Sequence, residues 1–151
     1  MNAEDLGYTP AVRLSEMIRQ KQVSPVEVVG ALLERITALE PQINAFVYLA
    51  ADQAMAAARS SEAALMKGGA LGPLHGVPVT IKDLAVTGDM PTQFGSLSQA
   101  GHQPAEDTPL VSRLKDAGAI VLGKTTTSEF GWKGVSQSPL TGITHNPCKH
   151  G

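Results

Sequence analysis

Two lysines stand where a parallel sheet could use them for catalysis. Lys82 closes the run VPVTIK and Lys124 closes the run AIVLGK, and both runs have the β-branched composition of buried strands. Because active sites in parallel sheets form beyond the carboxyl ends of the strands, both amines are candidates. Most lysines at strand ends are solvated charges, which is what we expect of Lys124. For Lys82 we predict partial burial, since Val79 and Ile81 beside it are apolar and burial makes a lysine amine a better base.

The stretch GAIVLGKT, residues 118–125, fits the phosphate-binding pattern G-x-x-x-x-G-K-[ST]. Such a loop needs a strand before its first glycine and a turn after it, so that backbone N–H groups surround the phosphates. Here a predicted helix precedes Gly118, and the four residues between the glycines are strand-forming. This order disfavours a nucleotide-binding protein. We interpret Gly118 as the end of the helix and Lys124 as the residue just past a strand.

Other polar groupings are weaker candidates. HNPCKH places His145, Cys148 and His150 close together, but a zinc site needs a fourth ligand and a fixed loop, so we favour a polar loop and expect no metal. GVSQS at residues 134–138 fails the pattern G-x-S-x-G at its last position, and it identifies no nucleophile. His75 is equally compatible with a hydrogen-bonding turn residue and with a catalytic group.

Composition limits the class of protein. The 151 residues are 42% hydrophobic and 17% charged, as expected of one globular domain. A net charge of −2 disfavours a nucleic-acid or membrane-surface binder. With a single cysteine, Cys148, and no basic or apolar leader in the first ten residues, we expect a cytoplasmic protein. No run reaches the roughly 18 apolar residues that a membrane span needs.

Helices dominate the first part of the chain. We predict that Thr9 caps a helix beginning at Pro10, and that Ser24 and Glu27 form a capping box for a second helix. The apolar stripe of the second helix runs over residues 28–39 and should end before Pro41. A short extended piece covers residues 43–49, and an Ala-rich helix follows, stopped by Gly68 and Gly69.

The second part has strand and helix patterns in alternation. Strands are predicted at Val77 to Lys82 and at Ala119 to Gly123, with a helix between them that Thr108 caps and Pro109 begins. Residues 87–105, rich in Gly, Pro, Ser and Gln, suit a surface excursion. Strand, helix and strand in this order predict a parallel pair with a right-handed crossover, and so the α/β class.

Three segments resemble successive segments of the amidase-signature family of hydrolases, in order and in spacing. They are GPLHGVPVTIKDL, DTPLVSRLKDAGAIVLGKTTTSEFG and SPLTGITHNP. The stretch SPVEVVGALLERITALEPQINAFVYL also resembles the opening helices of that family. The resemblance implies the N-terminal part of a single domain. Residues 1–69 would be helical, and residues 70–151 would be a β-α-β segment that starts a mixed α/β sheet.

The resemblance also implies a site. The family uses a Ser–cis-Ser–Lys triad to hydrolyse amides through an acyl-enzyme, without metal or organic cofactor, and its lysine falls on Lys82. Phe130 and Gly131 are implied to border the substrate pocket, and Thr126 stands where the family usually has Asn. In the family the Gly/Ser-rich oxyanion loop follows shortly after the NP segment. We therefore expect both serines to lie beyond Gly151, and these 151 residues alone to be inactive.

The function expected from these patterns is hydrolysis of a small-molecule amide. The alternatives are a member of the same family that works as part of an amidotransferase complex, and a non-catalytic binding or structural module on the same scaffold. The expected partner is the rest of the chain's own domain, with no direct nucleic-acid or membrane partner and with a homo-oligomer left open.

Overall fold

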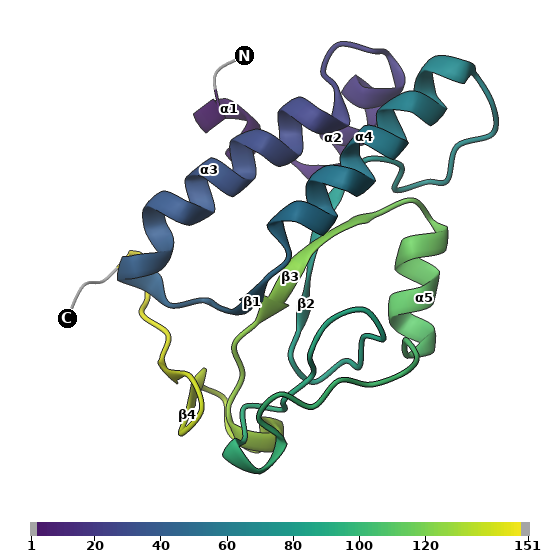
Figure 1. The fold of residues 1–151 in the computed structure, drawn as a ribbon. Coiled ribbons are helices and arrows are strands. Elements are labelled where there is room, and N and C mark those ends of the chain that lie inside the picture. Colours follow the sequence, from purple (N-terminus) through teal and green to yellow (C-terminus); the bar gives the residue numbers. More distant parts are fainter. Residues whose placement is uncertain (1–2, 149–151) are drawn as a thin grey trace. The chain divides into compact units, whose positions relative to one another are not determined.

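A computed structural model describes residues 3–148 and confirms the α/β class (Figure 1). The helices are α1 (Ala3–Tyr8), α2 (Ala11–Arg19), α3 (Pro25–Ile43), α4 (Ala51–Lys67) and α5 (Pro109–Asp116), with two 3₁₀ turns, η1 (Leu97–Gln99) and η2 (Glu129–Gly131). The strands are β1 (Phe46–Leu49), β2 (Pro78–Lys82), β3 (Ile120–Thr125), β4 (Gln137–Ser138) and β5 (Gly142–Ile143). No helix in this part of the chain is long and apolar enough to cross a membrane.

The start of α3 confirms the predicted capping box. The Ser24 hydroxyl accepts the Glu27 N–H at 3.1 Å, and the Glu27 carboxylate accepts the Ser24 N–H at 2.8 Å. The predicted Thr9 cap is wrong. The Thr9 hydroxyl instead donates to the Asp5 carbonyl at 2.7 Å, and α2 begins only after Pro10, which is extended at ψ 142°.

Pro41 does not end α3, contrary to the prediction. The helix continues through Pro41 to Ile43, and the proline removes one backbone N–H donor from the last turn. The Asn44 N–H still closes the last turn on the Glu40 carbonyl at 2.8 Å. Asn44 itself has φ 53°, and this left-handed conformation ends the helix.

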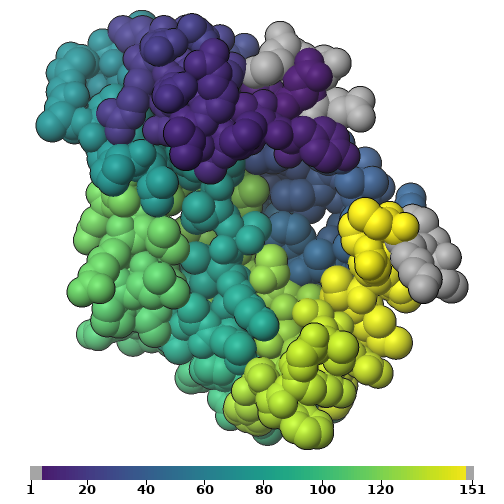
Figure 2. All heavy atoms as spheres, turned by 180° about the vertical axis from the view of Figure 1, so that it is seen from behind, coloured from purple at the N-terminus to yellow at the C-terminus, as the bar shows by residue number. Residues whose placement is uncertain are grey.

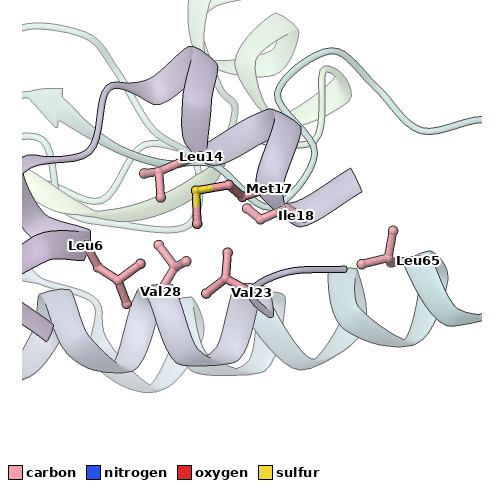
Figure 3. Close-up of a cluster of buried hydrophobic side chains, with 7 residues drawn as sticks. All are labelled: Leu6, Leu14, Met17, Ile18, Val23, Val28 and Leu65. Carbon is pink, nitrogen blue, oxygen red and sulfur yellow. The ribbon is translucent and has the colours of Figure 1, made fainter. Parts of the chain in front are cut away.

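The chain divides into two compact units. The first contains the described residues of 1–38, 50–79 and 113–122, and the second those of 39–49, 80–112 and 123–151. The core of the first unit is a cluster to which α1, α2, α3 and α4 all contribute (Figure 3): Leu6, Leu14, Met17, Ile18, Val23, Val28 and Leu65. Val28 of the predicted α3 stripe lies in this cluster, and Leu32 packs against it.

A second cluster in the same unit positions the start of β3. It contains Val29 of α3, Ala54 and Ala58 of α4, and Ile120 and Leu122 of β3, all buried. Ala54 and Ala58 lie one turn apart on one face of α4. Their small side chains allow the helix to pack against the strand, which accounts for alanine at these two positions.

The larger sheet has the strand order β1-β3-β2. β1 runs antiparallel to β3, with Phe46 opposite Thr125 and Leu49 opposite Gly123. β2 and β3 are parallel, as predicted: near one end the Ile120 N–H donates to the Val77 carbonyl, and near the other the Asp83 N–H donates to the Thr125 carbonyl. Because β3 continues to Thr125, Lys124 lies inside the strand rather than just past it.

Gly123 is required by close backbone contact. A β-carbon at this position would collide with the Tyr48 carbonyl oxygen, beside the irregularity in the β1–β3 pairing between Phe46 and Tyr48. Gly118 follows α5 with φ 89°, and its N–H donates to the Lys115 carbonyl at 2.8 Å. This confirms its interpretation as the helix terminator. Since a strand follows it, GAIVLGKT cannot form a phosphate-binding loop.

Residues 87–105 form the predicted surface excursion only in part: residues 97–105 are exposed or half-buried, whereas residues 87–96 contribute side chains to the interior. The segment has little regular structure, but Thr87, Met90, Thr92 and Ser96 in it are all almost fully buried. Its polar composition reflects hydrogen bonding in the interior of the second unit, because the hydroxyls of Thr87 and Thr92 bond to other buried groups.

Candidate functional site

The predicted lysine Lys82 lies at the end of β2 with an exposed side chain. Partial burial of this side chain is thus not observed, and the physical reason is its place in the sheet. β2 is an edge strand of the three-stranded sheet, and alternation places Thr80 and Lys82 on the side opposite to buried Ile81. Within residues 3–148, no hydrogen bond or ion pair engages the Lys82 amine.

Lys124, expected to be a solvated charge, has an exposed fraction of 0%. Its Nζ donates to Thr92 Oγ1 at 2.6 Å, to the Ala85 carbonyl at 2.8 Å and to Thr87 Oγ1 at 3.2 Å. Asp83 Oδ1 lies 3.5 Å from the same nitrogen. We call this group, Lys124 with Asp83, Ala85, Thr87 and Thr92, the Lys124 cluster.

The electrostatics of the cluster are those of a buried ion pair. Burial lowers the pKa of Lys124, and the carboxylates of Asp83, Asp89 and Asp107 act in the opposite direction. Asp83 is 1% exposed, and both its carboxylate oxygens accept the Gln93 N–H, at 3.1 and 3.2 Å. Both charges are therefore hydrogen-bonded, as buried charges must be.

Sequence reasoning missed Asp83, Thr87 and Thr92. The available signal was the charge of Asp83, which directly follows an apolar strand and complements a lysine on the neighbouring strand. The two threonines carried no local signal, since they stand in a stretch whose composition is typical of surface loops.

Phe130 and Gly131 lie in a tight turn that meets a second turn of the same kind. Phe94 and Gly95 have φ 54° and 63°, and Phe130 and Gly131 have φ 48° and 71°. The Phe130 N–H donates to the Phe94 carbonyl at 2.7 Å, and the two rings stack with centroids 6.0 Å apart. Left-handed phenylalanines are strained, and such strain persists where the surroundings impose it.

The turn at Phe130 and Gly131 lies close to the residues that follow β2. A β-carbon on Gly131 would come within 2.6 Å of Leu84 Cδ1, so the turn packs against the second residue after Lys82. The structure therefore brings Gly131 next to the segment that Lys82 begins.

The segment that continues from this turn forms part of the surface (Figure 2, yellow-green). Phe130 is 57% exposed and Trp132 is 76% exposed. A groove of about 380 Å³ is lined there by Glu129, Trp132, Lys133, Gln137, Ser138 and Pro139. Thr126, just before the turn, is buried; its hydroxyl lies 2.6 Å from that of Thr144, whose Oγ1 also donates to the Asn44 carbonyl.

The remaining candidate residues from the sequence form no functional grouping among residues 3–148. His75 is buried, and its Nε2 lies 2.9 Å from the Ser61 carbonyl oxygen, as in a hydrogen-bonding turn residue. The Ser138 hydroxyl pairs with that of Thr141 at 2.9 Å. His150 lies outside the described residues, and within residues 3–148 no three His, Cys, Asp or Glu side chains are grouped so as to hold a metal.

Comparison with known proteins gives concordant matches. The sequence profile of the Amidase family matches residues 27–151. A glutamyl-tRNA(Gln) amidotransferase subunit from Acidothermus cellulolyticus is 43% identical over 143 residues, which cover 95% of this chain and 28% of that protein. The acylamidase of Rhodococcus erythropolis is 37% identical over 151 residues, 100% of this chain and 32% of that protein.

A solved structure agrees in both fold and sequence. The peptide amidase of Stenotrophomonas maltophilia aligns with a TM-score of 0.85 and 34% identity, covering 94% of this chain and 30% of that one. The chain thus spans less than a third of the length of these two curated relatives. Since the family profile covers most of its residues and the fold agrees, the chain belongs to the amidase-signature family.

Proposed function

We propose that these residues are the N-terminal part of an amide hydrolase in which Lys82 is the base of a Ser–cis-Ser–Lys triad. One observation supports this above all: Lys82 presents an exposed amine at the carboxyl end of a strand, with no partner among residues 3–148. The other candidate lysine, Lys124, lies inside β3 and is buried and already bonded. Family membership adds the expectation that both serines are supplied by the rest of the domain.

The chemistry defines what Lys82 must do. The nucleophilic serine attacks the amide carbonyl and gives its proton to the bridging serine, which gives its own to the lysine amine. The amine must be neutral to accept it, and residues of the rest of the domain that pack over an exposed lysine would favour the neutral form. The lysine then returns the proton to the leaving amine, and water hydrolyses the acyl-enzyme.

The substrate we propose is a small-molecule amide, with Phe130 and Gly131 bordering its pocket. The exposed Phe130 ring and the contact of Gly131 with Leu84 support this placement. We place the protein in the cytoplasm and expect no direct contact with nucleic acid.

Membership of an amidotransferase complex is the second candidate, and the 43% identity to the Acidothermus cellulolyticus protein favours it. A hydrolase releases product by itself, whereas a component of such a complex would need its partner proteins for full turnover. Assay of the complete protein with and without added partner proteins distinguishes the two.

The test of the base is Lys82→Ala in the complete protein. We expect it to abolish nearly all hydrolysis of an acyl p-nitroanilide accepted by the wild type while leaving the fold intact, because the first proton acceptor is lost. Lys67→Ala, which removes an exposed lysine at the end of α4, is the matched control and should retain full activity. Wild-type turnover by the Lys82 variant would show that another group is the base.

A further inference from the structure

We propose that the Lys124 cluster is a positioning device for Lys82, built from an ion pair and two threonine hydroxyls. The inference rests on the proposed role of Lys82 as a base. It assigns a function to Lys124, whose side chain is fully buried and therefore cannot contact a substrate. Lys124, Thr87 and Thr92 are accordingly positioning residues.

All three N–H donors of the Lys124 ammonium are hydrogen-bonded. A lysine ammonium carries three N–H donors, and three oxygens lie within 3.2 Å of Nζ: the Thr92 hydroxyl, the Ala85 carbonyl and the Thr87 hydroxyl. The Asp83 carboxylate at 3.5 Å provides the countercharge. Lys124 is therefore satisfied as a cation and is held in one place.

The groups that bind Lys124 all come from the segment directly after Lys82. Asp83, Ala85, Thr87 and Thr92 lie within ten residues of the end of β2. Lys124 itself belongs to the middle strand of the sheet, so its amine ties this segment to the sheet at four points. Without it, the segment would have to bury Asp83 and the threonine hydroxyls with fewer partners.

Two successive hydrogen bonds, through the Ala85 peptide groups, lead from the Lys124 amine to the Lys82 carbonyl. The Ala85 carbonyl accepts from Lys124, and the Ala85 N–H donates to the Lys82 carbonyl at 2.9 Å. The Leu84 N–H donates to the same carbonyl at 2.7 Å. The N–H of Asp83, the residue after Lys82, donates to the Thr125 carbonyl at 3.0 Å. Both polar groups of the peptide bond that follows Lys82, its carbonyl and the Asp83 N–H, are thus hydrogen-bonded. Within residues 3–148 the Lys82 amine itself has no partner.

The threonine hydroxyls complete the support. Thr92 Oγ1 accepts from the Thr87 N–H at 3.2 Å as well as from Lys124. Thr87 Oγ1 donates to the Met90 carbonyl at 3.0 Å while accepting from Lys124. Both hydroxyls therefore hold the segment and the cation together, and removing either frees the turn without touching Lys82.

The test measures kcat and KM for an acyl p-nitroanilide in the complete protein. Thr92→Val removes the shortest bond to Lys124 at constant volume, and we expect about a tenfold lower kcat with KM little changed, since misplacement of a catalytic group slows the reaction more than it weakens binding. Thr92→Ser keeps the hydroxyl and should restore kcat. Thr127→Val is the matched control, because Thr127 is equally buried and its hydroxyl has no hydrogen-bond partner among residues 3–148.

Lys124→Met should lower kcat further, by about a hundredfold. If it does not fold, the Thr92 pair of variants decides. Wild-type kcat in Thr92→Val, an equal loss in Thr92→Ser, or an equal loss in Thr127→Val would each overturn the positioning role. Lys82→Ala in the same assay separates the two proposals. If Lys82→Ala is inactive and Thr92→Val is fully active, the positioning role alone is overturned. If Lys82→Ala is fully active, both the role of Lys82 as the base and the positioning role are overturned.

Discussion

At the scale of single residues, two lysines on neighbouring parallel strands, Lys82 at the end of β2 and Lys124 inside β3, have opposite environments. Lys82 is exposed and unpaired within residues 3–148, whereas Lys124 is fully enclosed by Asp83, two threonine hydroxyls and a carbonyl. A buried ion pair stabilises little relative to an apolar pair, but losing one partner leaves the other charge buried and costs about 3–5 kcal/mol. The cluster therefore acts through the geometry that it imposes more than through net stability.

The lowered pKa of Lys124 predicts a dependence of stability on pH. Since the folded pKa lies below the ordinary value of 10.5, the unfolded chain binds this proton more tightly than the folded one. The free energy of unfolding contributed by Lys124 should then rise with pH between its folded pKa and 10.5, and stay level above and below that window.

Urea unfolding of the complete protein at several alkaline pH values checks this, with Lys124→Met as the reference. The difference in unfolding free energy between wild type and variant should grow in favour of the wild type as pH rises through the window. A difference that shrinks would mean that Asp83 raises the pKa of Lys124 more than burial lowers it.

At the scale of elements, a capping box fixes where a helix begins, small residues allow a helix to pack on a strand, and a glycine allows two strands to pair. α3 begins at a reciprocal capping box, α4 packs through Ala54 and Ala58, and β3 approaches β1 at Gly123, where a side chain would collide with Tyr48. The capping box is local in the sequence, whereas the contacts of Ala54, Ala58 and Gly123 join distant segments and involve β3, the strand that carries Lys124.

The capping box predicts a defined stability change. Ser24→Ala leaves the Glu27 N–H without its acceptor, and it should lower the free energy of unfolding by about 1 kcal/mol in urea denaturation of the complete protein. Ser60→Ala is the matched control: that hydroxyl donates to the Ala56 carbonyl in the exposed middle of α4, where alanine is the better helix former. Equal losses from both variants would argue against a specific capping contribution.

At the scale of the whole molecule, the second unit presents three exposed apolar side chains that lie close together in the sequence. Phe130, Trp132 and Val135 are each more than half exposed. The first unit also exposes Tyr8, Val12 and Met66. In the three-stranded sheet, β1 and β2 are both edge strands. Unpaired edges and apolar patches favour association.

We therefore predict that purified residues 1–151 self-associate through the second unit. Sedimentation should show an average mass that rises with concentration, and Trp132→Ser should reduce this effect. Val12→Ser, which changes an exposed side chain of the first unit, should leave association unchanged. A monomer at all concentrations with a sharp thermal transition would show instead that the segment is an autonomous domain, and would favour the binding-module alternative.

The sequence alone determined the features that depend on neighbouring residues. The Ser24–Glu27 capping box, both strands of the parallel pair and the helix end at Gly118 were predictable because their bonds join residues a few positions apart or follow from local composition. Only tertiary structure decided which lysine is buried. Lys124 is bonded to residues 32 to 39 positions away, most of them in a stretch whose composition indicates a surface loop. Periodicity and composition report which residues prefer burial, whereas the burial of a charge depends on distant acceptors that the fold brings to it.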